Sequence, residues 1–298
     1  MSSADPNRLS LTQRLALRGI DGVTLLVLPA LLFVLLVFVY PFLYGLVLSF
    51  QPLEGGNPFA NYAKFFSDPY QYKTIWTTLR LAIPVSILSI LLAVPIAMRV
   101  RLMERQRLLT TILVLPVTLG TVLVAEGMLN YFGPQGWFSR SLMLLQITDG
   151  PLKLTNNYWG VLISLIITVF PFTFLLTLSY VTGIDPALEK AAATHGASAW
   201  QRFRHVILPL LVPGLAVAFC LTFVQAFAVF PSAVLVGAPS GETRVISIAA
   251  ANAAFDLYDD SLASAIAMIM ATVQLGVVAL VLALRGLFYR GSTAGGKG

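Results

Sequence analysis

Charged side chains are scarce in this chain of 298 residues. Only 11% are Asp, Glu, Lys or Arg, whereas ordinary soluble domains carry about 25%. Hydrophobic residues make up 57% of the sequence. This composition excludes an ordinary globular domain and indicates a polytopic membrane protein. The chain is long enough for several membrane spans, but not for a large domain outside the membrane as well.

Cysteine and histidine are also nearly missing, which restricts the chemistry available to the chain. Cys220 is the single cysteine, so it forms neither an intrachain disulfide nor a zinc site, and we interpret it as a small packing residue. The two histidines, His195 and His205, lie in one polar segment and form no His-Glu-x-x-His pattern. There is no nucleophile elbow either. The sequence therefore predicts no catalytic residue, no metal site and no cofactor held by this chain.

One fragment of a nucleotide-binding pattern stands at the C-terminus. Residues 291–297 match G-x-x-x-x-G-K, but a phosphate-binding loop then requires Ser or Thr and a following helix. Here Gly298 follows and the printed sequence ends. We therefore predict that residues 289–298 form a flexible tail without a nucleotide site.

Long apolar runs are what the sequence does contain. A transmembrane helix needs about 20 mainly apolar residues. The first run has no charged residue between Asp21 and Glu54, which is too long for the apolar region of a cleaved signal peptide, so it is predicted to be a spanning helix. The expected fold is an all-α integral membrane protein with about six transmembrane helices. They are placed near 23–50, 74–98, 108–132, 157–181, 207–236 and 261–288, after an N-terminal segment 1–22.

The basic residues predict which side of the membrane each connection occupies. Thirteen of the nineteen Lys and Arg residues lie in the N-terminal segment, 99–107, 182–206 and the C-terminal end. Because cytoplasmic connections carry the excess of Lys and Arg, both termini and the 182–206 segment are predicted to be cytoplasmic. The opposite connections are acidic, which we interpret as a solvated face. This distribution also argues against a nucleic-acid partner.

Two polar residues inside the predicted spans are candidates for a functional role. Glu126 is a carboxylate well inside its span, and ionisable groups in such positions usually face the bundle interior or a watery cavity. Two interpretations of Glu126 stay open: it lines a substrate path, or it lies near the helix end and pairs locally. Gln225 is an amide in apolar surroundings, for which interhelical hydrogen bonding is a common role.

The segment 183–209 is a polar insert between two spans, so it cannot be buried in lipid. Asp185 is suited to cap a helix N-terminus and Pro186 to occupy its first position. Gly196 is expected to end or bend that helix, and a second short helix is expected from Ser198 to about Ile207. We predict a helix–glycine–helix element on the cytoplasmic surface, suited to a groove on a partner protein.

The same segment carries a family resemblance. Glu189-Lys-Ala-Ala-Ala-Thr-His-Gly196, followed by Ile207-Leu-Pro209, resembles the EAA loop of the permease subunits of bacterial ABC importers, with Lys190 in place of the first alanine. Asn61-Tyr-Ala-Lys-Phe-Phe-Ser-Asp-Pro69 is similar to a segment of the spermidine/putrescine branch of that family.

The resemblance implies the type I ABC importer permease fold in the bacterial inner (plasma) membrane. It implies a second permease subunit, identical or homologous with a heterodimer as first choice, and an extracytoplasmic solute-binding protein. It also implies two ATPase subunits, which hold ATP and magnesium and receive the EAA loop as a coupling helix. Glu189 and Gly196 match the motif directly. The other coupling residues within it are Ala192, Thr194, His195 and Ala197.

The resemblance further suggests a substrate path and a substrate. In related permeases the fifth helix borders the central path, so Gln225, Phe227 and Phe230 are candidates to line it. The first expectation for the solute is a polyamine, on the strength of residues 61–69; thiamine, ferric iron or phosphonate are alternatives. The rival classes are an ATP-independent channel or secondary transporter and a membrane-integral scaffold.

Overall fold

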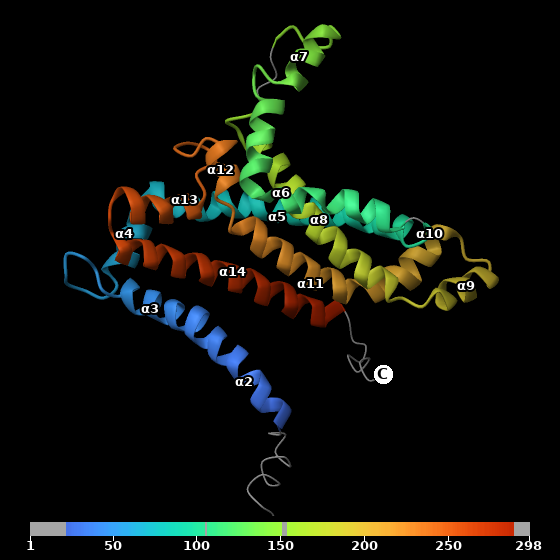
Figure 1. Cartoon of the computed structure of the whole chain (residues 1–298), viewed down its shortest axis with the longest axis horizontal. Coiled ribbons are helices and arrows are strands. Elements are labelled where there is room, and N and C mark those ends of the chain that lie inside the picture. The colour runs from blue at the N-terminus through green and yellow to red at the C-terminus, as the bar shows by residue number, and fades with distance from the viewer. Residues whose placement is uncertain (1–21, 105, 151–153, 289–298) are drawn as a thin grey trace, which may run out of the picture.

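The computed structural model describes residues 22–104, 106–150 and 154–288. The predicted segments 1–22, apart from its last residue, and 289–298 lie outside these ranges. The described residues form helices and no strands (Figure 1). In chain order they are α2 (Gly22–Val34), η2 (Leu35–Val39), α3 (Tyr40–Ser49), α4 (Ala60–Ser67), α5 (Pro69–Val100), α6 (Gln106–Phe132), α7 (Trp137–Leu144), α8 (Tyr158–Thr182), α9 (Pro186–Thr194), α10 (Ala199–Arg202), η3 (Phe203–Ile207), α11 (Leu208–Phe227), α12 (Pro231–Leu235), α13 (Ile246–Ala251), η4 (Asn252–Asp256) and α14 (Asp260–Phe288).

Membrane-length helices account for most of this list. Within the described residues, five helices are long and apolar enough to cross a membrane, and a bent pair in α6 and α7 makes a sixth if it counts as one span. The prediction of about six spans is therefore confirmed. The five are Leu26–Ser49, Pro69–Val100, Tyr158–Thr182, Ala199–Phe227 and Asp260–Gly286.

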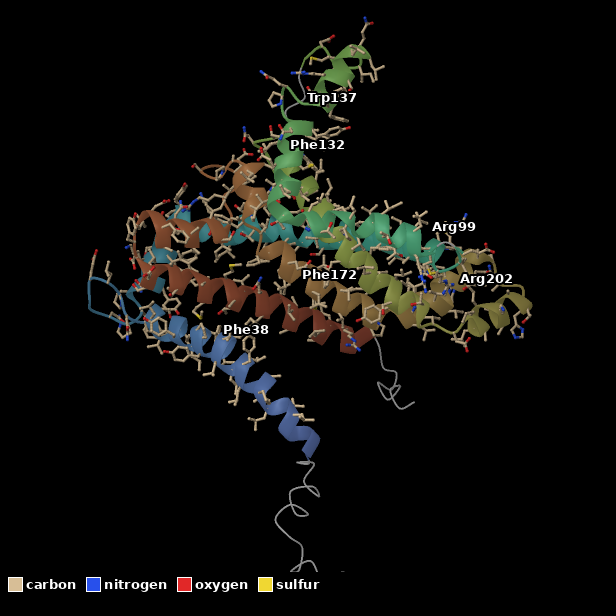
Figure 2. All side chains as sticks on the ribbon, in the orientation of Figure 1. Phe38, Arg99, Phe132, Trp137, Phe172 and Arg202 are labelled. Atoms are coloured by element: carbon tan, nitrogen blue, oxygen red, sulfur yellow. The ribbon has the colours of Figure 1, made fainter. Side chains whose placement is uncertain are left out.

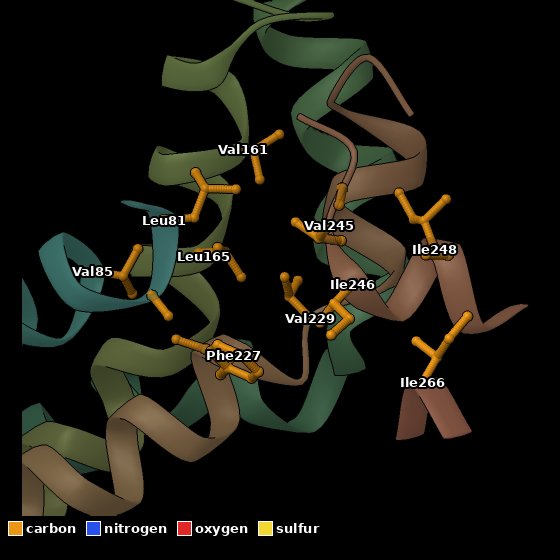
Figure 3. Packing of buried hydrophobic residues seen from close by; sticks show 14 of the residues in the cluster. Leu81, Val85, Val161, Leu165, Phe227, Val229, Val245, Ile246, Ile248 and Ile266 are labelled. Atoms are coloured by element: carbon orange, nitrogen blue, oxygen red, sulfur yellow. The ribbon is translucent and has the colours of Figure 1, made fainter. Parts of the chain in front are cut away.

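The centre of the bundle is built by α5, α8 and α11, with α14 and α13 packed alongside (Figure 1). Phe223 and Phe227 of α11 are completely buried and pack in one cluster with Val85 of α5 and Leu165 of α8 (Figure 3). Pairs of hydroxyl groups join the helices inside this apolar core. Thr173 and Thr222 lie 2.8 Å apart, oxygen to oxygen, and such interhelical hydrogen bonds satisfy polar groups that lipid cannot.

The first span stands apart from the bundle. In its most apolar window no residue is buried, and Figure 1 shows α2 running away from the other helices while α3 lies next to α14. Its attachment is at the α3 end, where the Asn61 side-chain amide donates to the Ser49 carbonyl at 3.1 Å and the Ser49 and Tyr62 hydroxyls meet at 2.8 Å. Phe38, midway along this span, is 64% exposed (labelled in Figure 2).

Helix α6 is bent near its middle. Pro116 removes one backbone donor, and Gly120 has φ +72° and ψ 164°, which lies outside the helical region. The segments before and after this point are inclined by 60°. The second half, with α7 at its tip, therefore extends away from the other helices as an arm, which carries Phe132 and Trp137 (Figures 1 and 2).

The predicted span 207–236 is wrong after Phe227. The helix ends at Phe227, and α12 begins separately at Pro231. Phe230 has φ −129° and ψ −56°, outside the helical region. The cause is local, because the proline ring disfavours a helical conformation in the residue before it. Pro231 is thus the first residue of a short helix and does not kink a long one.

Candidate functional site

The polar segment 183–209 folds as the sequence predicts at its start. Helix α9 is capped by Asp185, whose Oδ1 accepts a hydrogen bond from the Ala187 backbone N–H at 2.8 Å. Pro186 occupies the first helical position, where its missing N–H costs nothing. The α9 helix therefore begins at a fixed residue directly after α8.

Gly196 ends α9 by adopting a left-handed conformation, with φ +80°. The Ala197 N–H donates to the Ala192 carbonyl at 3.1 Å, and the Gly196 N–H donates to the Ala193 carbonyl at 3.0 Å. This pair of hydrogen bonds is a Schellman motif, which satisfies two carbonyls at the helix end. The predicted role of Gly196 as the break between two helices is confirmed, and its conformation explains the need for glycine.

The second helix of the segment does not end before the membrane. Ser198 and Gln201 form a capping box at its start, and from Ala199 the chain continues through α10, η3 and α11 as one helical span to Phe227. Residues 203–207 form a π-helical turn within it. The sequence predicted a separate short helix here, from Ser198 to about Ile207. Helix α9 is therefore connected to the fifth span by only the short turn around Gly196.

One face of α9 is open to solvent. No side chain of α9 is buried, and Leu188 is 47% exposed. Thr194, His195 and Gly196 are exposed, whereas Ala192 and Ala197 are half-buried against the rest of the loop. No described atom lies within 4 Å of the position that a Cβ on Gly196 would take. The coupling residues named from the sequence are thus brought together at one surface that has room for a partner.

Glu189 has a different environment from its neighbours on α9. Its Oε2 forms an ion pair with Nη2 of Arg101, which follows the last residue of α5. The Arg101 side chain is only 8% exposed, and that of Glu189 is 30% exposed. Glu189 therefore ties α9 to the end of α5 within the chain. Sequence reasoning missed Arg101; the only signal was its place in a basic connection on the same side as the loop.

A second candidate site, called the central pocket below, lies where two helices are interrupted. A pocket of about 450 Å³ adjoins both the bend of α6 and the break between α11 and α12. Interrupted helices at membrane depth are accepted only where the backbone is buried in protein or lines a cavity. The lining residues are Pro116, Gly120, Thr121, Leu165, Thr168, Val169, Phe172, Gln225, Ala228, Val229, Phe230, Pro231 and Ser232.

The path residues named from the sequence fall in three different environments. Gln225 and Phe230 line the pocket. Phe227 is fully buried in the helical core behind it. Glu126 lies on the exposed arm of α6, outside the pocket lining, where its backbone carbonyl accepts from the Asn130 side-chain amide at 3.0 Å. The structure thus brings Gln225 and Phe230 together and leaves Glu126 apart.

Sequence reasoning missed the other residues of the pocket lining. Among them are Thr121 from α6 and Thr168 and Phe172 from α8 (Phe172 is labelled in Figure 2). A hydroxyl group or an aromatic ring in an apolar helix does not by itself indicate whether the side chain faces a pocket, the core or lipid. The available signal was the pair of helix breakers at Pro116 and Gly120, which mark where α6 departs from a straight helix.

At the far end of the bundle from α9, a buried cation holds the 237–245 connection in place. Arg244 is 4% exposed; its guanidinium donates to the Tyr70 carbonyl at 2.8 Å and lies 3.8 Å from the centre of the Tyr70 ring. Burial lowers the pKa of Arg244, while Tyr70 and Asp68 act in the opposite direction. This contact anchors the connection to the start of α5.

Comparison with known proteins agrees with these features. The family model of binding-protein-dependent transport system inner membrane components matches residues 89–285. A spermidine/putrescine transport system permease protein of Haemophilus influenzae is 30% identical over 218 residues, which are 70% of this chain and 76% of that protein. A probable permease for starch degradation products of Thermoanaerobacterium thermosulfurigenes is 25% identical over 257 residues, 83% of this chain and 87% of that protein.

The fold is also that of a solved transporter. A crystal structure of a bacterial alginate ABC transporter, in complex with an alginate-bound periplasmic protein, superposes with a TM-score of 0.79 at 23% identity, over 95% of this chain and 99% of the compared chain. The family match spans the α5 end, the segment 183–209, the central pocket and most of α14. The chain belongs to the family of binding-protein-dependent transport system inner membrane components, the multi-pass inner membrane permeases of ABC importers.

Proposed function

We propose that this chain is one of two permease subunits of an importer in which α9 binds a groove on a partner ATPase. The proposal rests on the different environments of the side chains in and directly after α9. Glu189 forms an ion pair with Arg101 within the chain, whereas Leu188, Thr194 and Gly196 are exposed and available to a partner. ATP and magnesium belong to the two ATPase subunits. In this arrangement α9 and both termini are cytoplasmic, in agreement with the excess of Lys and Arg on that side.

The connections of α9 suggest how ATPase motion reaches the membrane. A displacement of α9 acts on α5 through Arg101 and on the fifth span through the turn at Gly196. Helices α5 and α11 both pack on α8, which together with α11 lines the central pocket. Movement of α9 therefore alters the helices around the pocket, which is what alternating access requires.

We propose that the central pocket is part of the solute path and that Gln225 and Phe230 contact the solute there. Phe227 supports this wall from behind. A polyamine is the first expectation for the solute, supported by the similarity to the spermidine/putrescine permease protein and by residues 61–69. Phe172 and Phe230 offer ring faces, and the Gln225 amide offers an oxygen, to an ammonium group.

A neutral, hydroxyl-bearing solute is the second candidate, and the pocket chemistry favours it. Among the described residues that line the pocket none is charged, although a carboxylate is the usual partner of a buried ammonium. Two threonine hydroxyls, one amide and two phenyl rings match hydroxyl groups and the apolar face of a sugar ring. The similarity to a permease for starch degradation products supports this alternative.

Reconstitution tests both the ATP-driven import and the choice between the two solutes. The importer, assembled with its ATPase and solute-binding protein in vesicles, should accumulate radiolabelled solute only when ATP is present on the α9 side. Spermidine and an oligosaccharide mixture then compete in the same assay. Uptake that continues without ATP contradicts the importer assignment, whereas inhibition by only one competitor decides between the two solutes.

A further inference from the structure

An apolar groove lies on the outside of the bundle, where α5 meets α10, η3 and α11. Its volume is about 590 Å³. On α5 it follows residues 90–98, which correspond to about 12 Å of helix, and it ends at the α9 end of the bundle. The lining residues are Ile90, Leu91, Val94, Pro95, Met98, Trp200, Phe203, Leu208 and Leu215.

Most of the groove lies along two membrane-length helices. Residues 90–98 are in the last third of the span Pro69–Val100, and Leu208 and Leu215 belong to the span Ala199–Phe227. All of its lining side chains are apolar. Its occupant must therefore be apolar over this part, because a polar group here would lose its hydrogen bonds to water.

The α9 end of the groove is basic. Arg99 follows the groove residue Pro95 by four positions, and Arg204 lies four positions from both Trp200 and Leu208. Residues four apart share a helix face, so both arginines continue the groove beyond its apolar part. Both are exposed, and neither forms an ion pair with any described residue, whereas Arg101 is paired with Glu189.

Two further features lie at this end of the groove. Trp200 is 64% exposed and stacks on Phe203 with ring centres 5.6 Å apart, and exposed tryptophans of membrane proteins favour the headgroup level. Arg202, next to Phe203, has a buried Nε without a hydrogen-bond partner in the described part of the chain. Figure 2 shows Arg99 and Arg202 at this same end of the bundle.

We propose that this groove binds one acyl chain of an anionic phospholipid, with the lipid phosphate held between Arg99 and Arg204. Charge complementarity favours this occupant over a helix of the second permease: the groove is apolar along its length and cationic only at the end where a headgroup lies. On the sidedness proposed above, this is the cytoplasmic leaflet, whose anionic lipids attract basic groups near the surface. The proposal concerns a lipid and is independent of the transported solute.

Native mass spectrometry of the importer, purified with all its subunits, tests the site. The complex is incubated with phosphatidylglycerol or with phosphatidylcholine of the same acyl chains, and retained lipid is counted. The double variant Arg99→Gln/Arg204→Gln should reduce phosphatidylglycerol retention by about fivefold for each arginine. Arg107→Gln/Arg285→Gln removes the same charge from the side predicted to be the same, at positions that do not line the groove, and should retain phosphatidylglycerol normally. Val94→Phe, which fills the groove, should reduce retention with both arginines in place.

Three outcomes overturn the proposal. The first is equal retention of the two lipids, which would leave no role for the arginines. The second is displacement of phosphatidylglycerol by millimolar inorganic phosphate, which would show a headgroup site without the groove. The third is loss of the second permease subunit from Val94→Phe with unchanged lipid, which would assign the groove to a protein partner.

Discussion

Arg101 and Glu189 are 88 residues apart in sequence, yet they form an ion pair that joins the end of α5 to α9. Removing Glu189 leaves a guanidinium at 8% exposure without its partner. We expect Glu189→Gln to lower the stability of the purified complex by about 1–3 kcal/mol, less than for a fully buried pair because Glu189 is 30% exposed. Thermal unfolding in detergent measures this.

The charge-reversed variant Arg101→Glu/Glu189→Arg is the control for this pair. It should recover part of both the stability and the solute-stimulated ATPase activity lost in each single variant. Additive losses in the double variant would show that the two residues act independently.

Gly196 provides a test that separates backbone conformation from partner contact. Asparagine tolerates a left-handed conformation, whereas valine does not, and the space around Gly196 is open within the chain. We therefore expect Gly196→Val to lose co-purification of the ATPase, with local strain of about 1–2 kcal/mol. Gly196→Asn should keep the α9 end intact. If Gly196→Asn also loses the ATPase, the partner surface excludes any side chain at this position.

Gly214 of α11 packs directly against α8. A Cβ at this position would lie 2.5 Å from Cγ of the Tyr180 ring. Gly214→Ala should therefore destabilise the helix pair by about 1–3 kcal/mol, as overpacking does, measured by thermal unfolding. Gly276→Ala on α14 is a matched control, because no described atom lies within 4 Å there; it should be neutral or stabilising. Equal effects of the two substitutions would contradict the close packing.

The pocket residues and the core residue behind them should respond differently. Gln225→Ala and Phe230→Ala should raise the KM for uptake with little change in unfolding temperature, since both side chains are exposed to the pocket. Phe227→Ala should instead cost about 3–5 kcal/mol of stability, because it empties a fully buried position. A KM effect from Phe227→Ala alone would place the solute path elsewhere.

Glu126→Gln decides between the two interpretations of this carboxylate. Glu126 is exposed on the arm of α6 and does not line the central pocket. We expect ATP-driven uptake to stay within about twofold of the wild-type rate, an effect below about 0.4 kcal/mol. A tenfold loss with normal assembly would show that the solute passes the arm.

Much of the fold could be predicted because a membrane makes strong demands on sequence. Runs of about 20 apolar residues located the spans, and the cap at Asp185 and the turn at Gly196 follow from side-chain and backbone chemistry within a few residues. The break at Phe230 was missed because the mainly apolar run 207–236 continues through Pro231 without a charged residue. The fifth span ends before Pro231 because Phe230 adopts a non-helical conformation.

The long-range parts of the site were not predictable in the same way. Nothing near Glu189 indicates Arg101, because their contact depends on how α8 returns the chain beside the end of α5. Likewise, Gln225 and Phe227 are two residues apart on one helix, yet one lines the pocket and the other the core. Which of the two side chains faces the pocket depends on where the neighbouring helices lie, and the sequence near them does not show this.

Because the helix from Ala199 to Phe227 is continuous, the loop before it has a fixed rotational position relative to the fifth span. One residue added to or removed from a regular stretch of it would turn the loop by about 100° about the span and shift it by about 1.5 Å, which would carry Trp200 off the groove. A single-residue insertion in this stretch would therefore disturb the groove more than a substitution of one exposed side chain would. The π-helical turn at residues 203–207 already holds one extra residue per turn, and it is the place where a change in length could be absorbed.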